Sequence, residues 1–214
     1  MMTRWFVAAA MLALLIANPA NACKGSKILF ADDFRDADPA WPVDTTNLYA
    51  IGDGKFTITP VATAAPNVMW IALYGGSLFG DVDMCVTLTF PAGEGVGEQS
   101  GGLAFWGTDI NNVYRFGISP GGTASIIRWQ NGKVLFPVSW RKADAIKTAP
   151  GATNTLRVTL NGMSATTYIN DTPFFTIKGQ PPEGGSEIGI SAGKGEKASF
   201  PFVFTNLKVT DLPK

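Results

Sequence analysis

The sequence predicts an all-β fold made of two antiparallel sheets that pack face to face. The stretch from Gly101 to Trp129 contains three short strand patterns in a row, joined by two tight connections. Asp81–Phe90 alternates between apolar and polar side chains, which is typical of a strand with one face on a core. The chain also has 24 glycines and 14 prolines scattered along it, as expected where many short strands need many turns.

Fourteen segments have the composition and length of strands and are bounded by turn residues. In chain order they are Ser26–Phe34, Leu48–Ile51, Lys55–Thr59, Val68–Tyr74, Asp81–Phe90, Leu103–Trp106, Val113–Ser119, Ala124–Trp129, Val134–Val138, Thr155–Leu160, Ala165–Asn170, Pro173–Lys178, Glu187–Ala192 and Ser199–Asp211. Hairpin turns are expected at Gly52-Asp53-Gly54, at Asn131-Gly132 and at Asn161-Gly162. Ser139–Lys147 has apolar residues at every third position, which predicts a short helical connector.

The first 22 residues are predicted to be a secretion signal, which leaves residues 23–214 as a single domain. Arg4 supplies a positive start, Trp5 to Ala17 is apolar, and Ala20-Asn21-Ala22 offers the small residues that signal peptidase needs. The apolar run of about 13 residues is shorter than the ~20 residues that cross a bilayer. The alternatives are an uncleaved membrane anchor and a lipid anchor on Cys23. We expect plain export to the periplasm or the cell exterior, with no membrane attachment after cleavage.

Export determines how the two cysteines are interpreted. Cys23 and Cys85 are the only cysteines, and outside the cytoplasm they would lie in an oxidising compartment. We therefore expect a disulfide between them, and two free thiols are the alternative. A bridge that closes a loop of this length contributes roughly 4 kcal/mol in the chain-entropy model.

Composition excludes several function classes. Basic and acidic residues are balanced at 17 each, and no block of basic residues is present, which argues against a nucleic-acid partner. The chain contains no histidine, which removes Ser-His and Cys-His nucleophile systems and argues against a catalytic zinc site. The glycine-rich piece Gly93–Gly97 is followed by a strand rather than by a helix N-terminus, so we interpret it as a loop and not as a phosphate site.

Several sequence phrases resemble laminin G-like domains of the concanavalin A-like lectin and glucanase superfamily. They are NTLRV (Asn154–Val158), NG (Asn161-Gly162), ATTYIN (Ala165–Asn170), GGLAF (Gly101–Phe105), NNVYRF (Asn111–Phe116), LFADDF (Leu29–Phe34) and FTNLKV (Phe204–Val209). The resemblance covers nearly all of residues 23–214, and its motifs are strand cores and turns. It implies a two-sheet antiparallel jelly-roll sandwich, one sheet convex and one concave. The predicted signal and the composition are those of a bacterial exported protein. Many members of the group bind carbohydrate on the concave face or at its rim, and some hydrolyse it.

A hydrolase of this fold needs two carboxylates about 5 to 9.5 Å apart across the scissile bond. Asp81 and Asp83 share one face of a strand and are the best local pair. Related glucanases carry a third acid two residues further along, where this chain has Cys85. The chain therefore does not complete the glucanase pattern, and we interpret these acids as solvated strand-end residues.

Sugar binding needs aromatic faces for pyranose rings and planar polar groups for hydroxyls. If Phe105 lies opposite Tyr114, then Trp106 and Arg115 face away from the core together, which leaves the guanidinium in water. The alternative is that the tryptophans fill the core, as we expect for Trp70. The candidate ligand-binding residues are Trp106, Arg115, Arg128, Trp129, Asn111, Asn112 and Trp140. The two asparagines are first of all turn residues.

Calcium is the one metal that the resemblance implies. Asp32, Asp33 and Asp211 lie on strands expected to be neighbours, and Asp53 and Asp109 lie in loops. None of them forms a contiguous calcium loop, so the sequence leaves a structural calcium open and predicts no other cofactor.

We therefore expect an exported, non-catalytic carbohydrate-binding domain that holds a glycan on its concave sheet face. Two alternatives stay open: a glycoside hydrolase of the same fold with carboxylates from separate strands, and an envelope interaction scaffold without a small ligand. The sequence predicts neither the glycan nor the oligomeric state.

Overall fold

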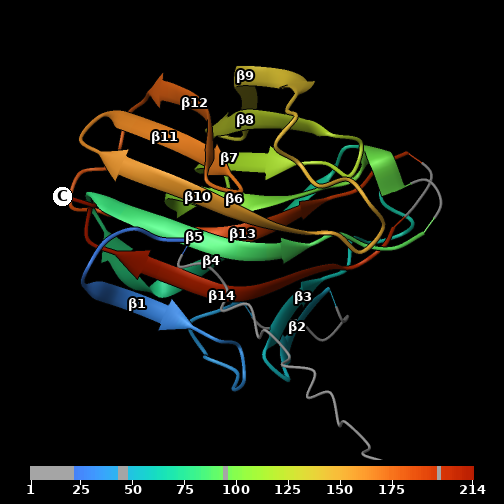
Figure 1. Ribbon diagram of the computed structural model, residues 1–214, viewed down its shortest axis with the longest axis horizontal. Coiled ribbons are helices and arrows are strands. Elements are labelled where there is room, and N and C mark those ends of the chain that lie inside the picture. Colours follow the sequence, from blue (N-terminus) through green and yellow to red (C-terminus); the bar gives the residue numbers. More distant parts are fainter. Residues whose placement is uncertain (1–21, 43–47, 94–95, 197–198) are drawn as a thin grey trace, which may run out of the picture.

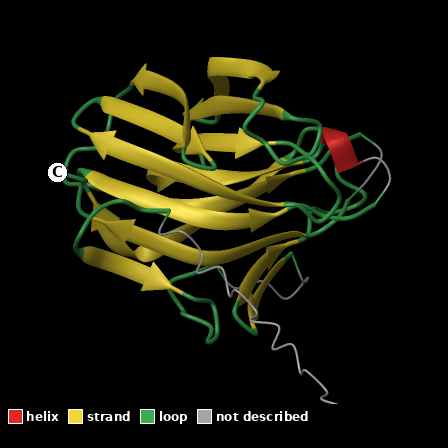
Figure 2. Cartoon of the chain, in the orientation of Figure 1, coloured by secondary structure: helices red, strands yellow, loops and turns green. Residues whose placement is uncertain are grey.

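The computed structural model describes residues 22–42, 48–93, 96–196 and 199–214. In these ranges the chain forms strands and one 3-10 turn, η1 (Val96–Glu98), which is the short red segment in Figure 2. The predicted secretion signal lies outside the described residues except for Ala22. Among the residues described, no helix is both long enough and apolar enough to span a membrane.

The strands form two antiparallel sheets, which lie one behind the other in Figure 1. The eight-stranded sheet has the order β12-β11-β10-β5-β14-β3-β2, and β1 pairs with β14. Its strands are β1 (Ile28–Asp32), β2 (Tyr49–Gly52), β3 (Lys55–Ile58), β5 (Val82–Thr89), β10 (Thr153–Asn161), β11 (Ser164–Ile169), β12 (Thr172–Lys178) and β14 (Phe202–Thr210).

The six-stranded sheet has the order β4-β13-β6-β7-β8-β9. Its strands are β4 (Met69–Phe79), β6 (Ser100–Asp109), β7 (Asn112–Ile118), β8 (Thr123–Gln130), β9 (Lys133–Lys142) and β13 (Ser186–Gly193). The predicted all-β class and its two antiparallel sheets are confirmed. β9 and β12 are the edge strands at the same end of the two sheets (Figure 1).

The predicted helical connector, Ser139–Lys147, is wrong: residues 143–147 form a turn and irregular chain, and the first four residues are strand. Ser139 to Lys142 continue β9, where Arg141 pairs with Ala124 and Lys142 with Thr123. The backbone N–H and C=O groups of these residues form hydrogen bonds with β8. Strand pairing therefore determines the local structure, and the three-residue spacing of apolar side chains does not.

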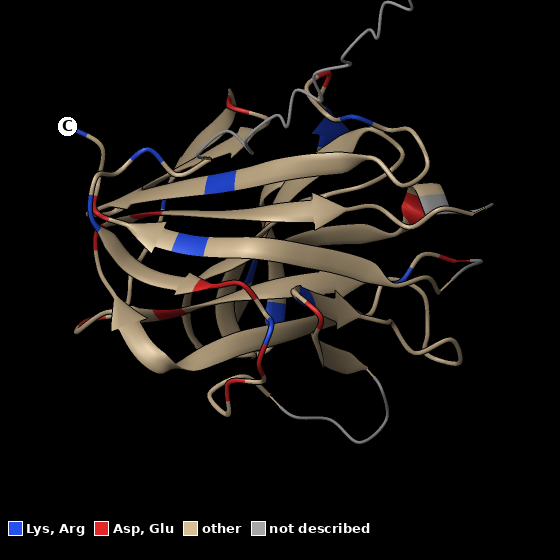
Figure 3. Cartoon of the chain, turned by 60° about the horizontal axis from the view of Figure 1, so that its bottom comes forward, with Lys and Arg blue, Asp and Glu red and all other residues tan. Residues whose placement is uncertain are grey.

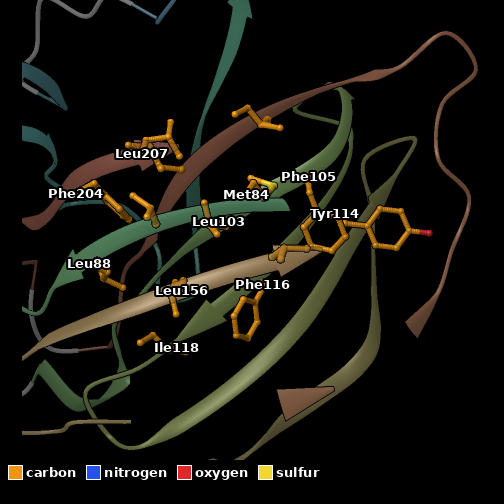
Figure 4. Close-up of a cluster of buried hydrophobic side chains, with 14 of the residues drawn as sticks. Met84, Leu88, Leu103, Phe105, Tyr114, Phe116, Ile118, Leu156, Phe204 and Leu207 are labelled. Carbon is orange, nitrogen blue, oxygen red and sulfur yellow. The ribbon is translucent and has the colours of Figure 1, made fainter. Parts of the chain in front are cut away.

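The main core lies between the sheets and follows the predicted alternation. On β5 the residues from Val82 to Leu88 at every second position are buried against the facing sheet, whereas Asp83 and Cys85 point to the outer face. On the six-stranded sheet, Phe105 pairs with Tyr114 as predicted. Figure 4 shows these side chains meeting between the sheets, with the Tyr114 hydroxyl pointing out of the cluster.

The predicted disulfide between Cys23 and Cys85 is present. It fastens the segment that precedes β1 to the outer face of the eight-stranded sheet. The Lys24 N–H donates to Asp83 (2.6 Å) and the Lys27 N–H to Asp211 (2.8 Å), which continues the attachment. Because its sulfur is bonded to Cys85, Cys23 has no thiol left to carry a lipid anchor.

The Asp83 carboxylate is completely buried and forms an ion pair with Arg157 on the neighbouring strand β10, at 2.7 Å. The Arg157 guanidinium also lies over the Tyr168 ring, 4.3 Å from its centroid. Figure 3 shows the other charged residues dispersed over the ribbon rather than gathered in one patch.

Candidate functional site

Trp106 is buried, with only 3 % of its surface exposed, so the prediction that it faces solvent is wrong. The β6–β7 pairing shifts register between Phe105 and Asp109, and Trp106 has a positive φ of 50°. This irregularity turns the indole toward the core, where it packs against Phe105 and Tyr114 with ring centroids 5.5 and 5.3 Å apart. A bulge of this kind re-aims a side chain that strict alternation would place on the other face.

Arg115 faces away from the main core as predicted, but its guanidinium is fully buried rather than in water. Its Nε donates to the Ser191 hydroxyl (2.7 Å) and its Nη2 to the Ser100 hydroxyl (2.9 Å). Burial lowers the pKa of Arg115 to about 9. Trp106 and Arg115 therefore do not form the open recognition surface that the sequence predicted.

The remaining predicted residues are distributed over four places. Trp129 is half-buried and packs on the outer face of the six-stranded sheet against a small apolar cluster that includes Val113. Trp140 is 38 % exposed on β9. Asn111 and Asn112 form the β6–β7 turn, where the backbone N–H of the first and the side-chain amide of the second donate to Asp109. Only Arg128 lines a cleft together with other polar and aromatic groups.

That cleft, which we call the edge cleft, lies between β9 and β12 at the edge of the sandwich and has a volume of about 540 Å³. It is formed in part by strands β8 and β9, by the turn after β10 and by the segment after β12. The residues that line it are Tyr114, Arg128, Leu135, Phe136, Pro137, Met163, Lys178, Gly179 and Gln180.

The polar side of the edge cleft is held in a fixed geometry. The Arg128 guanidinium lies over the Tyr114 ring, 5.0 Å from its centroid, and donates from Nη2 to the Gln180 side-chain oxygen at 2.8 Å. The Gln180 backbone N–H donates to the Tyr114 hydroxyl at 3.4 Å. These contacts restrain the guanidinium before any ligand arrives, which reduces the entropy lost on binding.

Trp106 forms the layer directly beneath this cleft. A Cβ atom added to Gly179 would lie 2.4 Å from Cζ3 of Trp106 and 3.0 Å from the Tyr114 hydroxyl. Glycine at position 179 therefore lets the chain cross the indole at van der Waals contact. The predicted tryptophan supports the cleft from below instead of lining it.

The other side of the edge cleft is apolar and open to solvent. Phe136 is 52 % exposed, Met163 is 60 % exposed and Leu135 is 44 % exposed. An exposed ring beside a guanidinium and an amide is the combination that sugar recognition requires. Sequence reasoning missed Phe136, Lys178 and Gln180 because strands distant in sequence bring them together.

The carboxylates considered for hydrolysis are engaged in structural contacts. Asp81 accepts a hydrogen bond from the Gly162 N–H at 2.7 Å, and Asp83 is held in the buried ion pair with Arg157. Cys85, at the place of the third glucanase acid, is in the disulfide. A second cleft of about 280 Å³ on this outer face is lined by polar residues of β10 and β11, with Arg157 and Tyr168 among them.

A different pair of carboxyl groups comes from separate strands. Burial raises the pKa of Glu187 on β13, and the nearby Asp109 charge raises it further. Hydrogen bonds from the Asn112 side chain and the Asn111 backbone lower the pKa of Asp109. The two neighbouring acids thus have pKa values displaced in opposite directions.

The residues that the structure describes bring together no group of three acidic, cysteine or histidine side chains able to hold a metal. Asp32 accepts from the Trp41 indole N–H (2.8 Å), and Asp33 is paired with Arg35. Asp211 accepts from the Lys27 backbone N–H, which lowers its pKa. These aspartates therefore organise loops and strand ends.

Comparison with solved structures identifies the fold as a concanavalin A-like jelly-roll sandwich. A carbohydrate-binding module, CBM66, from Bacillus subtilis superposes with a TM-score of 0.58 at 15 % identity, over 80 % of this chain and 95 % of that one. A β-glucanase from Bacillus licheniformis gives 0.60 at 12 % identity, over 85 % and 97 % of the two chains. A galectin-like protein of unknown function from Bacillus subtilis gives 0.59 at 9 % identity, over 88 % and 97 %. No family model and no curated protein matches the sequence.

Proposed function

We propose that this chain is an exported carbohydrate-binding protein that holds a glycan in the edge cleft without cleaving it. The observation that supports this most directly is the restrained Arg128 guanidinium facing a cleft with the exposed Phe136 ring on its wall. The edge cleft replaces the sheet face as our proposed site because Trp106 and Arg115 are both buried. The disulfide fits a protein of an oxidising compartment, in the periplasm or outside the cell.

The cleft offers complementary surfaces for the two sides of a sugar. The Phe136 ring can cover the C–H face of a pyranose, which contributes apolar contact. The Arg128 fork and the Gln180 amide can bond to ring hydroxyls, and Lys178 adds a third donor at the same wall. Binding of this kind needs no acid, base or metal, in agreement with the structural use of Asp81 and Asp83.

A glycan array followed by titration of the best ligand tests the site. We expect Arg128→Ala to weaken glycan binding by about 10-fold or more, because a hydrogen bond to a charged group is worth ~1.5–3 kcal/mol. Phe136→Ala should weaken it by roughly 3- to 10-fold, since stacking contributes ~0.5–1.5 kcal/mol beyond area burial. Calorimetry or fluorescence titration measures both.

Arg141→Ala is the matched control, because Arg141 is an exposed β9 arginine that lies over Phe175 outside the edge cleft. It should bind the glycan as wild type does. Unchanged affinity in both Arg128→Ala and Phe136→Ala would show that the edge cleft is not the binding site. No array signal from the wild-type protein would count against carbohydrate binding itself.

Glycoside hydrolysis is the second candidate, and the opposed pKa values of Glu187 and Asp109 favour it. Two neighbouring carboxyl groups whose pKa values are shifted in opposite directions are the arrangement that glycosidases use. Incubating the bound glycan with wild-type protein and with Glu187→Gln, and measuring new reducing ends, separates the two functions. Our proposal expects no release from either protein. Release by the wild type that disappears in Glu187→Gln would establish the hydrolase instead.

A further inference from the structure

The outer face of the six-stranded sheet contains a buried positive charge that no acid compensates. Arg115 is completely buried, and none of the ion pairs among the described residues includes it. Its Nε and Nη2 donate to two neutral serine hydroxyls, and its Nη1 has no hydrogen-bond partner in the described part of the chain. A buried, uncompensated cation costs several kcal/mol, so a counter-charge at this point would stabilise the fold.

A second unpartnered polar group lies beside this nitrogen. The guanidinium lies directly over Gly117, where an added Cβ would be 2.0 Å from Nη1. Ser125 pairs with Gly117 across the β7–β8 ladder, and cross-strand neighbours are ~5 Å apart at Cβ. The Ser125 hydroxyl is fully buried and also has no partner within the residues described. Two unsatisfied donors from adjacent strands therefore flank the same point of the sheet.

The surroundings add positive charge. Lys194 directly follows β13, is only 8 % exposed, and donates its ammonium to the Ala64 carbonyl rather than to a carboxylate. The preceding residue, Gly193, pairs with Ser100, the serine that accepts from Arg115. Two buried cations, one on β7 and one directly after β13, are thus bonded only to neutral oxygens. A water molecule would satisfy the free donors but would leave both charges uncompensated.

We propose that a small monovalent anion of the halide class binds between Nη1 of Arg115 and the hydroxyl of Ser125 on the outer face of the six-stranded sheet. The guanidinium supplies charge and one N–H donor, and the serine supplies an O–H donor. Glycine at position 117 leaves room for the guanidinium to lie flat on the sheet. This site is separate from the edge cleft and does not depend on the proposed function.

Thermal unfolding of the purified protein in sodium bromide, with sodium gluconate at equal ionic strength as reference, tests the site. A ligand that binds only the folded state raises the unfolding midpoint by an amount that grows with its concentration. We expect bromide at ten times its dissociation constant to raise the midpoint by about 3–5 °C over gluconate. In wild type the rise should grow with the logarithm of the bromide concentration, and it should be lost or strongly reduced in Ser125→Ala and Arg115→Met.

Ser186→Ala is the matched control, because Ser186 is an equally buried serine whose hydroxyl donates to the Phe79 carbonyl. This variant should keep the bromide response. If Arg115→Met fails to fold, the bromide response of Ser125→Ala and a bromide-soaked crystal of the wild-type protein test the proposal instead. In the crystal, we expect an anomalous peak between Arg115 and Ser125. An equal response to bromide and gluconate in wild type, or water density without anomalous signal at that position, would overturn the proposal.

Discussion

Replacing Arg157 with leucine should lower the free energy of unfolding by about 3–5 kcal/mol, because it leaves the Asp83 carboxylate buried without its counter-charge. After the substitution, the backbone N–H of Lys24 would be the remaining donor to that carboxylate among the contacts described above. The substitution also removes the cation–π contact with Tyr168. For a domain of this size the unfolding midpoint should fall by roughly 6–20 °C, measured by circular dichroism or calorimetry.

Two further variants show that the unpaired charge is the cause. Removing both charges in Asp83→Leu/Arg157→Leu should recover most of the lost stability, since an apolar pair of similar volume often replaces a buried ion pair at little cost. Lys142→Ala breaks an ion pair with Asp144 that is exposed on both sides, and it should leave the midpoint nearly unchanged. A midpoint for Arg157→Leu close to that of wild type would show that the ion pair with Asp83 does not contribute to stability.

Reducing the disulfide should destabilise the protein by about 4 kcal/mol, because Cys23 and Cys85 are 62 residues apart and their bond restricts a long loop in the unfolded chain. The folded state loses attachment as well. The Lys24 N–H lies one residue from the bridge and donates to Asp83, so release of this segment weakens the buried ion pair next to it. The midpoint in excess reductant should be roughly 8–16 °C lower than in its absence.

The double variant Cys23→Ala/Cys85→Ala separates loss of the bridge from other effects of the reductant. Its midpoint should equal that of the reduced wild type and should not respond to reductant. Identical midpoints for oxidised and reduced wild type would mean that the bridge contributes nothing to stability under these conditions. Expression in a reducing cytoplasm should likewise yield less folded protein than export does.

Features that depend on neighbouring residues were predictable from the sequence. The alternation in Asp81–Phe90 gave the correct buried face, and the apolar row through Phe105 and Tyr114 gave the correct pairing. The pairing of Cys23 with Cys85 followed because there are no other cysteines. Each of these conclusions needed only the local periodicity of apolar residues, the turn residues or the number of cysteines.

Features that depend on distant residues were not predictable in the same way. The positive φ of Trp106 breaks the period-two rule at one residue, and it falls on the tryptophan itself rather than on Gly107, the glycine that follows it. Arg115 is buried because Ser191, 76 residues further along the chain, brings its hydroxyl to the guanidinium. The edge cleft combines Arg128 with Gln180, 52 residues away, across the gap between two sheets. Sequence reasoning identified one residue of this cleft and placed it on a different surface.

The position of Arg115 has a consequence for how the chain finds its native pairing. Side chains on a strand alternate, so a slip of β7 by one residue against β6 and β8 would move this guanidinium into the apolar interior and place Phe116 outside. The serine hydroxyls that accept its hydrogen bonds lie on the outer surface, out of reach of a guanidinium in the interior. A misaligned sheet would therefore bury the guanidinium among aromatic rings without hydrogen-bond partners. The free-energy cost of that burial favours the native alignment during folding.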